Sequence, residues 1–204
     1  MATNTLAPWG LQFTRNRRAS SPTYQANQYT IKKTYATKIG LGDVVGIGSG
    51  SNQGYIVLAA DGASSILGVF AGGLSYFDTN LQQNIFSQWW TGTASPSADV
   101  PCLVIDDPDA RFMAQVSGGP FVQTWIGSNI DWVYGGGTSG NGNPNIAGIS
   151  QLALNGSSVA NTNTLPFRIT GTQGITGGPQ DPANTNPWIE VCINTSQNLS
   201  STGV

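Results

Sequence analysis

Three aspartates crowd one short stretch, Asp106-Asp107-Pro108-Asp109, and their side chains are the ones whose type could support catalysis. Two carboxylates that face each other across a cleft can transfer protons or hydrolyse a glycosidic bond. Neighbours in a turn point outward into water instead, and Asp and Pro are themselves turn-forming residues. Oxygen-rich turns also bind Ca²⁺, but adjacent acids do not supply the spaced ligands of a known calcium loop. We therefore predict solvated turn residues, with a metal site and catalysis as the less favoured alternatives.

The lack of histidine narrows the chemistry further. None of the 204 residues is a histidine, which removes the commonest general base, the usual nucleophile pairs and the usual zinc sites. Cys102 and Cys192 lie in apolar runs, so we expect buried free thiols, and a disulfide between them is left open. The glycines at 46–50 precede a strand and not a helix, which indicates a hairpin loop rather than a nucleotide site. The sequence therefore predicts no catalytic residue, no metal ligand and no cofactor.

Short β-rich runs, separated by Gly, Asn, Asp, Ser and Pro, follow one another along the chain. The runs at 102–105 and 112–116 flank the acidic turn, which predicts a β-hairpin. Asn155-Gly156 is typical of a two-residue hairpin turn. Further strands are expected at 42–47, 55–60, 66–77, 84–90, 121–125, 130–134, 149–154, 165–170 and 188–194. No segment shows a helical period over ten residues, so we predict an all-β fold, either a β-sandwich or a tulip-like β-barrel.

Charge is scarce and unevenly distributed. Charged residues make up 9% of the chain, against about 25% in an ordinary domain, which suggests a surface largely covered by partners. The first 40 residues hold six of the eight basic residues and no acid, and the remainder holds all ten acids. We therefore predict an extended basic N-terminal arm over 1–38, a β-rich body over 39–195 and a polar tail over 196–204. Whether the arm gains order on a partner or lies on its own body is left open.

The character of the arm favours some partners over others. Its basic residues could contact an acidic protein face, a neighbouring copy or nucleic acid. The arginine cluster is short and belongs to no recognised nucleic-acid module, so nucleic acid is not expected. The arm has no amphipathic stripe, and the chain has no run of about 18 apolar residues. It also begins without a secretory signal, so we expect no membrane partner and synthesis in a cytosol.

The adjacent residues Trp89 and Trp90 would point to opposite faces of a strand. Together with Trp125 and Trp132 they could form a platform on which sugars stack. Tryptophan is also frequent in cores and enriched in subunit contacts, and we favour that use. Trp89 and Trp90 are therefore the candidate subunit contacts, and a carbohydrate- or receptor-binding fibre domain is the alternative.

Five segments in order give the chain a family resemblance: GDVV at 42–45, ILGVF at 66–70, YFD at 76–78, QWW at 88–90 and VIDDPDARFMAQ at 104–115. Over roughly 39–115 the chain resembles capsid decoration (cement) proteins of tailed bacteriophages. The Asp-Asp-Pro-x-x-x-Phe-x-x-Gln element is the most specific part of the match, and the LPFRIT stretch at 165–170 matches weakly.

The resemblance implies a virion structural protein without enzymatic activity, made in the host cytoplasm and bound to the outer surface of the icosahedral head. Its partners would be the major capsid protein and copies of itself in a homotrimer. The basic arm would reach across neighbouring capsid subunits, with apolar anchors beside the charges. The candidate capsid contacts are Trp9, Phe13, Arg15, Arg17, Arg18, Lys32 and Lys33.

Overall fold

The computed structural model describes residues 6–17, 25–134, 148–172 and 182–199. Within them the chain forms strands, turns and short 3₁₀ helices, so the predicted all-β class is confirmed. The strands are β1 (Gln12–Asn16), β2 (Asn27–Ile31), β3 (Val44–Ile47), β4 (Ile56–Leu58), β5 (Gly68–Gly72), β6 (Leu74–Asp78), β7 (Gln83–Ser87), β8 (Val100–Ile105), β9 (Ala110–Ser117), β10 (Asn129–Tyr134), β11 (Leu152–Ala160), β12 (Phe167–Thr172) and β13 (Trp188–Ile193). The 3₁₀ helices are η1 (Gly50–Asn52), η2 (Gln123–Trp125) and η3 (Gln197–Leu199). No helix in these ranges is long and apolar enough to cross a membrane.

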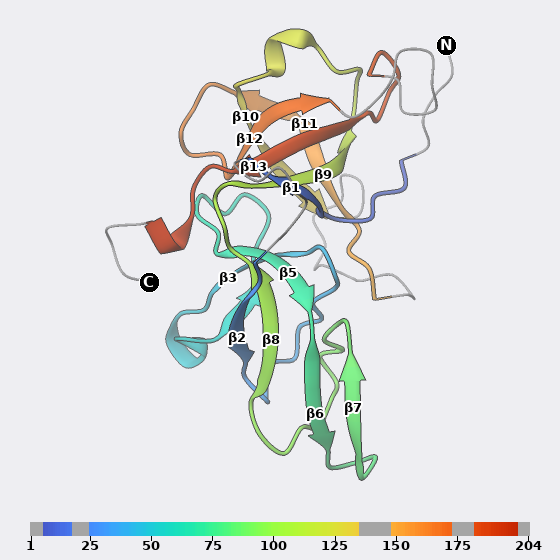
Figure 1. Cartoon of the computed structure of the whole chain (residues 1–204), viewed down its shortest axis with the longest axis vertical. Coiled ribbons are helices and arrows are strands. Elements are labelled where there is room, and N and C mark those ends of the chain that lie inside the picture. Colours follow the sequence, from blue (N-terminus) through green and yellow to red (C-terminus); the bar gives the residue numbers. More distant parts are fainter. Residues whose placement is uncertain (1–5, 18–24, 135–147, 173–181, 200–204) are drawn as a thin grey trace.

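A barrel occupies one end of the molecule (Figure 1). Its strands follow the order β1-β9-β11-β10-β12-β13, and β13 pairs again with β9, which closes a ring of five strands with β1 beside it. β9 allows this closure because it pairs with three strands, β1, β11 and β13. β1 and β13 pair with overlapping parts of β9, at 110–113 and 111–115, and therefore lie on its opposite edges. β11 pairs beyond the end of β1, at 116–117.

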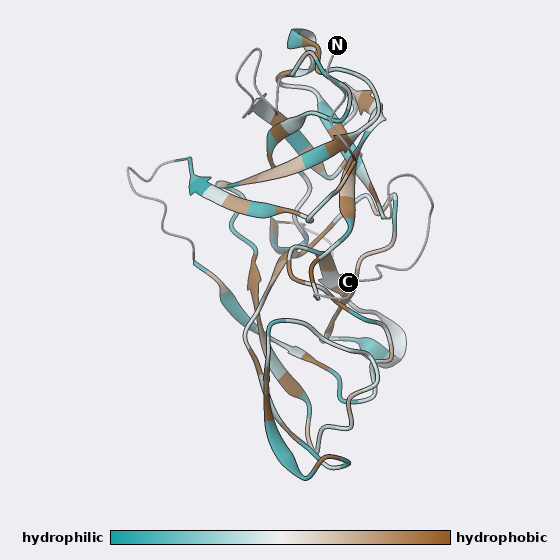
Figure 2. Cartoon of the chain, turned by 90° about the vertical axis from the view of Figure 1, so that its right-hand side faces the viewer, coloured by the Kyte–Doolittle hydropathy of each residue, from teal (hydrophilic) through white to brown (hydrophobic). Residues whose placement is uncertain are grey.

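A five-stranded antiparallel sheet, in the order β2-β8-β5-β3-β4, lies next to the barrel, and the β6–β7 hairpin projects at the far end (Figure 1). Both faces of this sheet are buried. Val44 and Val69 pack into the core of the barrel, while their neighbours Val45 and Phe70 pack into a second cluster around Trp90. Hydrophobic residues accordingly appear in both parts of the chain (Figure 2). Burial on both faces explains why these strands are continuous apolar runs and not alternating ones.

The predicted hairpin at the acidic turn is wrong in its pairing. β8 pairs with β2 and β5, whereas β9 pairs with β1, β11 and β13. The turn therefore joins two different sheets. Asn27 and Tyr29 of β2 donate hydrogen bonds to the carboxylate of Asp106. These bonds hold the end of β8 beside β2, so the chain turns a corner at this point.

Two other local predictions are corrected. Asn155-Gly156 lies inside β11 and not in a turn. A Cβ at Gly156 would lie 2.9 Å from Cγ1 of Val116, so glycine is needed there for the close approach of β11 to β9. Most of the expected strand at 121–125 is helix η2, where the rings of Phe121 and Trp125 pack edge to face with centroids 5.8 Å apart. Phe121 and Trp125 therefore pack against each other in a turn and do not mark a strand.

Parts of the predicted arm belong to the two sheets, and part of the predicted tail is hydrogen-bonded to one of them. Strand β1 pairs with β9 in the barrel, and β2 pairs with β8 in the five-stranded sheet. Near the C-terminal end, the side chain of Gln197 accepts a 2.7 Å hydrogen bond from the backbone N–H of Ile47. Of the two alternatives for the arm, these described strands match the one in which it lies on its own body.

Asp43 is a buried acid at the start of β3. Its carboxylate accepts a 2.6 Å hydrogen bond from the backbone N–H of Gly40. Burial raises the pKa of Asp43 to about 6, although hydrogen bonds from Ser150 and Gly40 act in the opposite direction. The folded-state pKa therefore lies above the ordinary value of 3.8. The stability that this group contributes is fully present below that ordinary value and is lost as the pH rises through about 6.

We predict that Asp43→Asn removes this pH dependence, because asparagine keeps an acceptor oxygen and carries no charge. Between about pH 4 and pH 7, the wild type should lose roughly 2–3 kcal/mol of unfolding free energy that the variant keeps. Urea unfolding of both proteins across this range measures the difference. Asp107→Asn, in the surface turn, is the control. Parallel pH curves for Asp43→Asn and the wild type would contradict the prediction.

Candidate docking surfaces

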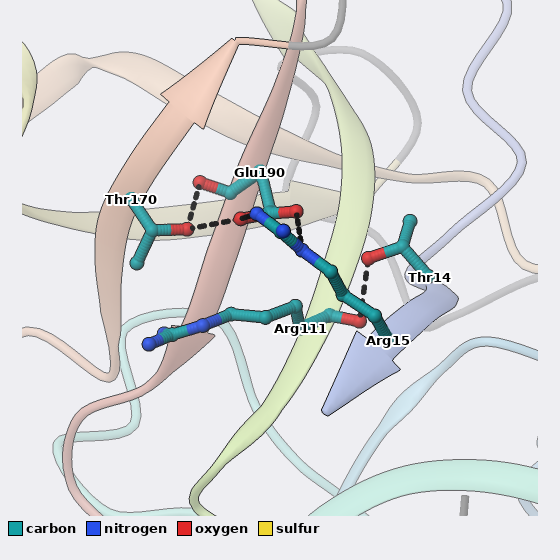
Figure 3. A network of polar contacts seen from close by, with 5 residues as sticks. All are labelled: Thr14, Arg15, Arg111, Thr170 and Glu190. Carbon is teal, nitrogen blue, oxygen red and sulfur yellow. Dashed lines mark hydrogen bonds and ion pairs between the residues drawn. The ribbon is translucent and has the colours of Figure 1, made fainter. Parts of the chain in front are cut away.

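The basic N-terminal segment is fixed to the barrel through Arg15 (Figure 3). The guanidinium of Arg15 donates two hydrogen bonds to Glu190 on β13, from Nε to Oε2 at 3.1 Å and from Nη2 to Oε1 at 3.0 Å. The hydroxyl of Thr170 donates a further bond of 2.9 Å to Oε1. The side chain of Glu190 is 3% exposed and that of Arg15 is 62% exposed. An exposed arginine therefore neutralises a buried carboxylate.

This ion pair controls the charge state of Glu190. Burial by itself would raise the pKa of the carboxyl, but the hydrogen bonds from Arg15 and Thr170 and the nearby positive charges outweigh it, so the pKa is lowered. Close by, the hydroxyl of Thr14 donates to the backbone carbonyl of Arg111 (Figure 3). Arg15 is one of the candidate capsid contacts, but its guanidinium is already bound by Glu190 of the same chain.

The other basic candidates differ in their surroundings. Lys32 is half-buried, its Nζ donates to the carbonyl of Ser51, and it lies 5.9 Å from the ring centroid of Tyr55. Arg17 and Lys33 are both exposed and are anchored through their backbones. The N–H of Arg17 donates to the carbonyl of Asp109, and that of Lys33 donates to the carboxylate of Asp99. Arg18 lies outside the described residues.

Trp9 and Phe13, the two aromatic candidates of the arm, both line an apolar pocket of about 260 Å³. Trp9 and Leu41 are 57% and 38% exposed, and the ring of Phe13 packs edge to face on Phe112. The backbone N–H of Leu11 donates to the carbonyl of Gly42, which holds the two walls together. The pocket is lined by Trp9, Leu11, Gln12, Phe13, Leu41, Gly42, Val69, Phe70, Ala71, Ile105 and Ile149. The sequence identifies the wall that contains Trp9 and Phe13 but not the residues from 41 onward, because these come from distant segments.

The β6–β7 hairpin carries a second apolar surface that sequence reasoning missed. In its register Ser75 faces Phe86 and Phe77 faces Asn84, so Phe77 and Phe86 lie diagonally on one face. Phe86 is 80% exposed and Phe77 is 39% exposed, while Leu81 in the turn is 61% exposed. The apolar residues at 85 and 86 are adjacent, so the sequence predicts a strand there but does not say which face meets the body.

The tryptophans do not form a sugar-stacking platform, and Trp90 is not an exposed subunit contact. Trp90 is 1% exposed, and its Nε1–H donates to the carbonyl of Tyr35, so this candidate subunit contact is a core residue. Trp132 is fully buried in the barrel, where it packs edge to face on Phe167. Trp89 is half-buried against Gly148 and lies in a bend after β7, not in the expected strand. With two of the four rings buried, the sugar platform is not assembled.

The acidic turn is partly as predicted. Oδ1 of Asp107 accepts a 2.8 Å hydrogen bond from the N–H of Asp109, which is the expected turn chemistry. Asp106 was expected to be solvated but is 7% exposed, because donors from β2 and from Asn198 surround its carboxylate. Across the described ranges no group of three or more acids or cysteines is placed to hold a metal ion.

Both cysteines are free and buried, as predicted. Burial raises the pKa of the Cys102 thiol to about 12. Burial likewise raises the pKa of the Cys192 thiol, against the charge of Arg111. Nucleophilic chemistry and metal binding both need the thiolate, which these surroundings disfavour.

We predict that Arg15→Gln destabilises the fold by about 1–2 kcal/mol, because it leaves the carboxylate of Glu190 buried without a counter-charge. The loss is smaller than for a fully buried pair because water reaches Arg15. Adding Glu190→Gln should recover part of it, since a neutral amide needs no counter-charge. Chemical unfolding of the single and double variants measures both effects.

Arg17→Gln is the matched control for this experiment, because Arg17 is an exposed arginine two residues further along. Its effect should stay within about 0.5 kcal/mol of the wild type. If Arg15→Gln and Arg17→Gln have equal effects, the ion pair with Glu190 does not hold the segment in place.

No protein-family model, no curated protein and no solved structure matches the chain. Its function is therefore inferred from the surfaces themselves, namely a basic segment in which Arg15 is neutralised, an apolar pocket and an apolar hairpin.

Proposed function

We propose that this chain is a structural protein of a virus particle, a decoration protein that binds the outside of a tailed-phage head and stabilises contacts between major capsid subunits. In this proposal it has no enzymatic role. The observation that carries the proposal is the pairing of a charge-poor chain with two exposed apolar surfaces, the pocket at Trp9 and Leu41 and the hairpin at Phe86. Exposed apolar patches of this kind mark surfaces that bind other proteins.

The extent of the resemblance also supports the proposal. The stretch from 39 to 115 runs from just before β3, through the β6–β7 hairpin, into β9. It therefore includes the projecting hairpin and the corner at Asp106 as one continuous piece of structure. In addition, two of the acids are engaged in the fold, with Glu190 bound by Arg15 and Asp106 bound by three donors.

The electrostatic part of head binding falls to the exposed cations. Apart from Arg15, whose guanidinium is bound by Glu190, Arg17 and Lys33 are the candidate cations of the basic segment that are both described and exposed. Charges at the rim of a contact change the association rate and its salt dependence more than they change packing. The proposed contact with an acidic capsid face should therefore weaken as salt is added.

We predict that the purified chain co-sediments in a saturable manner with empty shells of the major capsid protein encoded by the same genome. Reversal of charge in Arg17→Glu and Lys33→Glu should each weaken binding about tenfold. Lys38→Glu is the control, because Lys38 is exposed on the same segment but is not a predicted contact. Failure of the wild-type chain to sediment with intact shells would overturn the proposed function.

A further inference from the structure

The β6–β7 hairpin is built to project a rigid apolar knob. The carboxylate of Asp78 accepts hydrogen bonds from the backbone N–H groups of Asn80, Leu81 and Ser95, which fixes the turn to the neighbouring loop. The inner face is anchored by Tyr76, whose ring packs edge to face on Trp90 with centroids 6.0 Å apart.

The outer face of the same hairpin is left open to solvent. It carries Phe77 and Phe86, with Leu81 at the turn. An isolated two-stranded hairpin is only marginally stable in water. This hairpin is stabilised by the hydrogen bonds of Asp78 and by the packing of Tyr76 on Trp90. The result is a fixed element whose exposed face is apolar. We name Phe77, Leu81 and Phe86 the knob.

The pocket between β1 and β5 has the size and chemistry to receive an aromatic ring. Its volume is about 260 Å³, and a cavity of about 150 Å³ is enough to hold benzene. None of the described residues that line it is charged. Trp9 and Leu41 at its rim are exposed, and aromatic side chains in such pockets are typical anchors of protein contacts.

The knob and the pocket are both uncharged. The sequence from 74 to 98 carries a single charged residue, Asp78, whose carboxylate is already held by three backbone N–H groups. A neutral knob therefore fits a neutral pocket without burying an unpaired charge, which would be costly. An acidic capsid face would offer the pocket no such match, whereas another copy of this chain would.

We propose that the knob of one copy inserts into the pocket of the next, with the ring of Phe86 as the anchor. The hydrogen bonds of Asp78 at the turn and the packing of Tyr76 on Trp90 fix the hairpin in its projecting position, so a copy does not fill its own pocket. A contact between two different surfaces is head-to-tail, and such contacts generate closed rings when the rotation closes. The inference goes beyond the proposed function and does not require it, since it concerns contacts between copies.

The buried area indicates why a ring is needed. Full burial of a phenylalanine side chain removes roughly 150–250 Å² from solvent, and Phe77 is only 39% exposed before any contact forms, so the knob and the pocket together offer a small area. The total stays below the roughly 1,200–2,000 Å² of a stable interface. One contact is therefore weak, and a closed ring holds every copy at both its knob and its pocket, which raises the effective concentration at each contact.

Light scattering on the purified full-length chain, without capsid protein, tests the ring. The wild type should have a mass several times that of the monomer, and three times would match the expected trimer. Phe86→Glu and Leu41→Glu should each be monomeric, and Phe86→Glu should keep the wild-type melting temperature because Phe86 is 80% exposed. Val122→Glu, at an exposed apolar residue on the barrel, should assemble like the wild type. A monomeric wild type at high concentration, or assembly that survives Phe86→Glu, overturns the proposal.

A disulfide trap tests the pairing of the two surfaces. Phe86→Cys on one chain and Leu41→Cys on another should form a linked dimer on oxidation of the mixture, whereas Phe86→Cys mixed with Val122→Cys should not. The native thiols are buried and give little background. Equal yields from both mixtures overturn the pairing.

Capsid binding separates this inference from the proposed function. If Phe86→Glu stays assembled but no longer binds shells, the hairpin contacts the shell and the knob-in-pocket proposal is overturned. If neither the wild type nor any variant binds shells, but the disulfide trap succeeds, the contact between copies is supported and the proposed function is overturned.

Discussion

The carboxylate of Asp106 lies where the chain leaves the five-stranded sheet and enters the barrel, and three side chains donate hydrogen bonds to it. Asn27 and Tyr29 reach it from β2 at 2.8 and 2.7 Å, and Asn198 reaches it from η3 at 2.7 Å. A buried carboxylate is tolerated only when its acceptor sites are satisfied, so this one group requires all three segments to be in place. The arm, the corner between β8 and β9, and the C-terminal helix are thereby fixed to each other. The pocket depends on this corner, because Ile105 in its wall precedes Asp106.

Sequence reasoning located the strands better than it located their partners. Apolar runs and turn residues are local signals, and they placed most strands within a few residues. Pairing depends on distant segments. The Asn-Gly dipeptide at 155–156 has a strong local preference for a turn, but packing against Val116 overrides it and keeps β11 continuous. At 104–115 the local pattern favoured a hairpin, whereas bonds from β2, which lies 77 to 79 residues earlier, produced a corner.

The same limit applies to the candidate site. Composition correctly marked the N-terminal segment as basic, but it could not reveal that Arg15 is bound by a glutamate 175 residues away. Trp9 and Phe13 were identified as anchors by residue type alone, and their meeting in one pocket depends on Leu41 and on Val69 of β5. Phe86 gave no signal of its own, because an exposed and a buried phenylalanine have the same letter. Only the register of β6 and β7 shows which face it occupies.

The scarcity of charge now has a physical explanation that joins the fold to the surfaces. Both faces of the five-stranded sheet are buried, so its residues have little room for charge. Elsewhere in the chain, Glu190 is tied to Arg15 and Asp78 is tied to the turn beside it. A surface with few charges costs less to desolvate when it meets another protein, because no ion must be stripped of water. Contacts through the pocket and the hairpin should therefore depend weakly on salt, while any contact through Arg17 and Lys33 should depend strongly on it. One chain thus presents two kinds of surface whose contributions differ in their response to ionic strength.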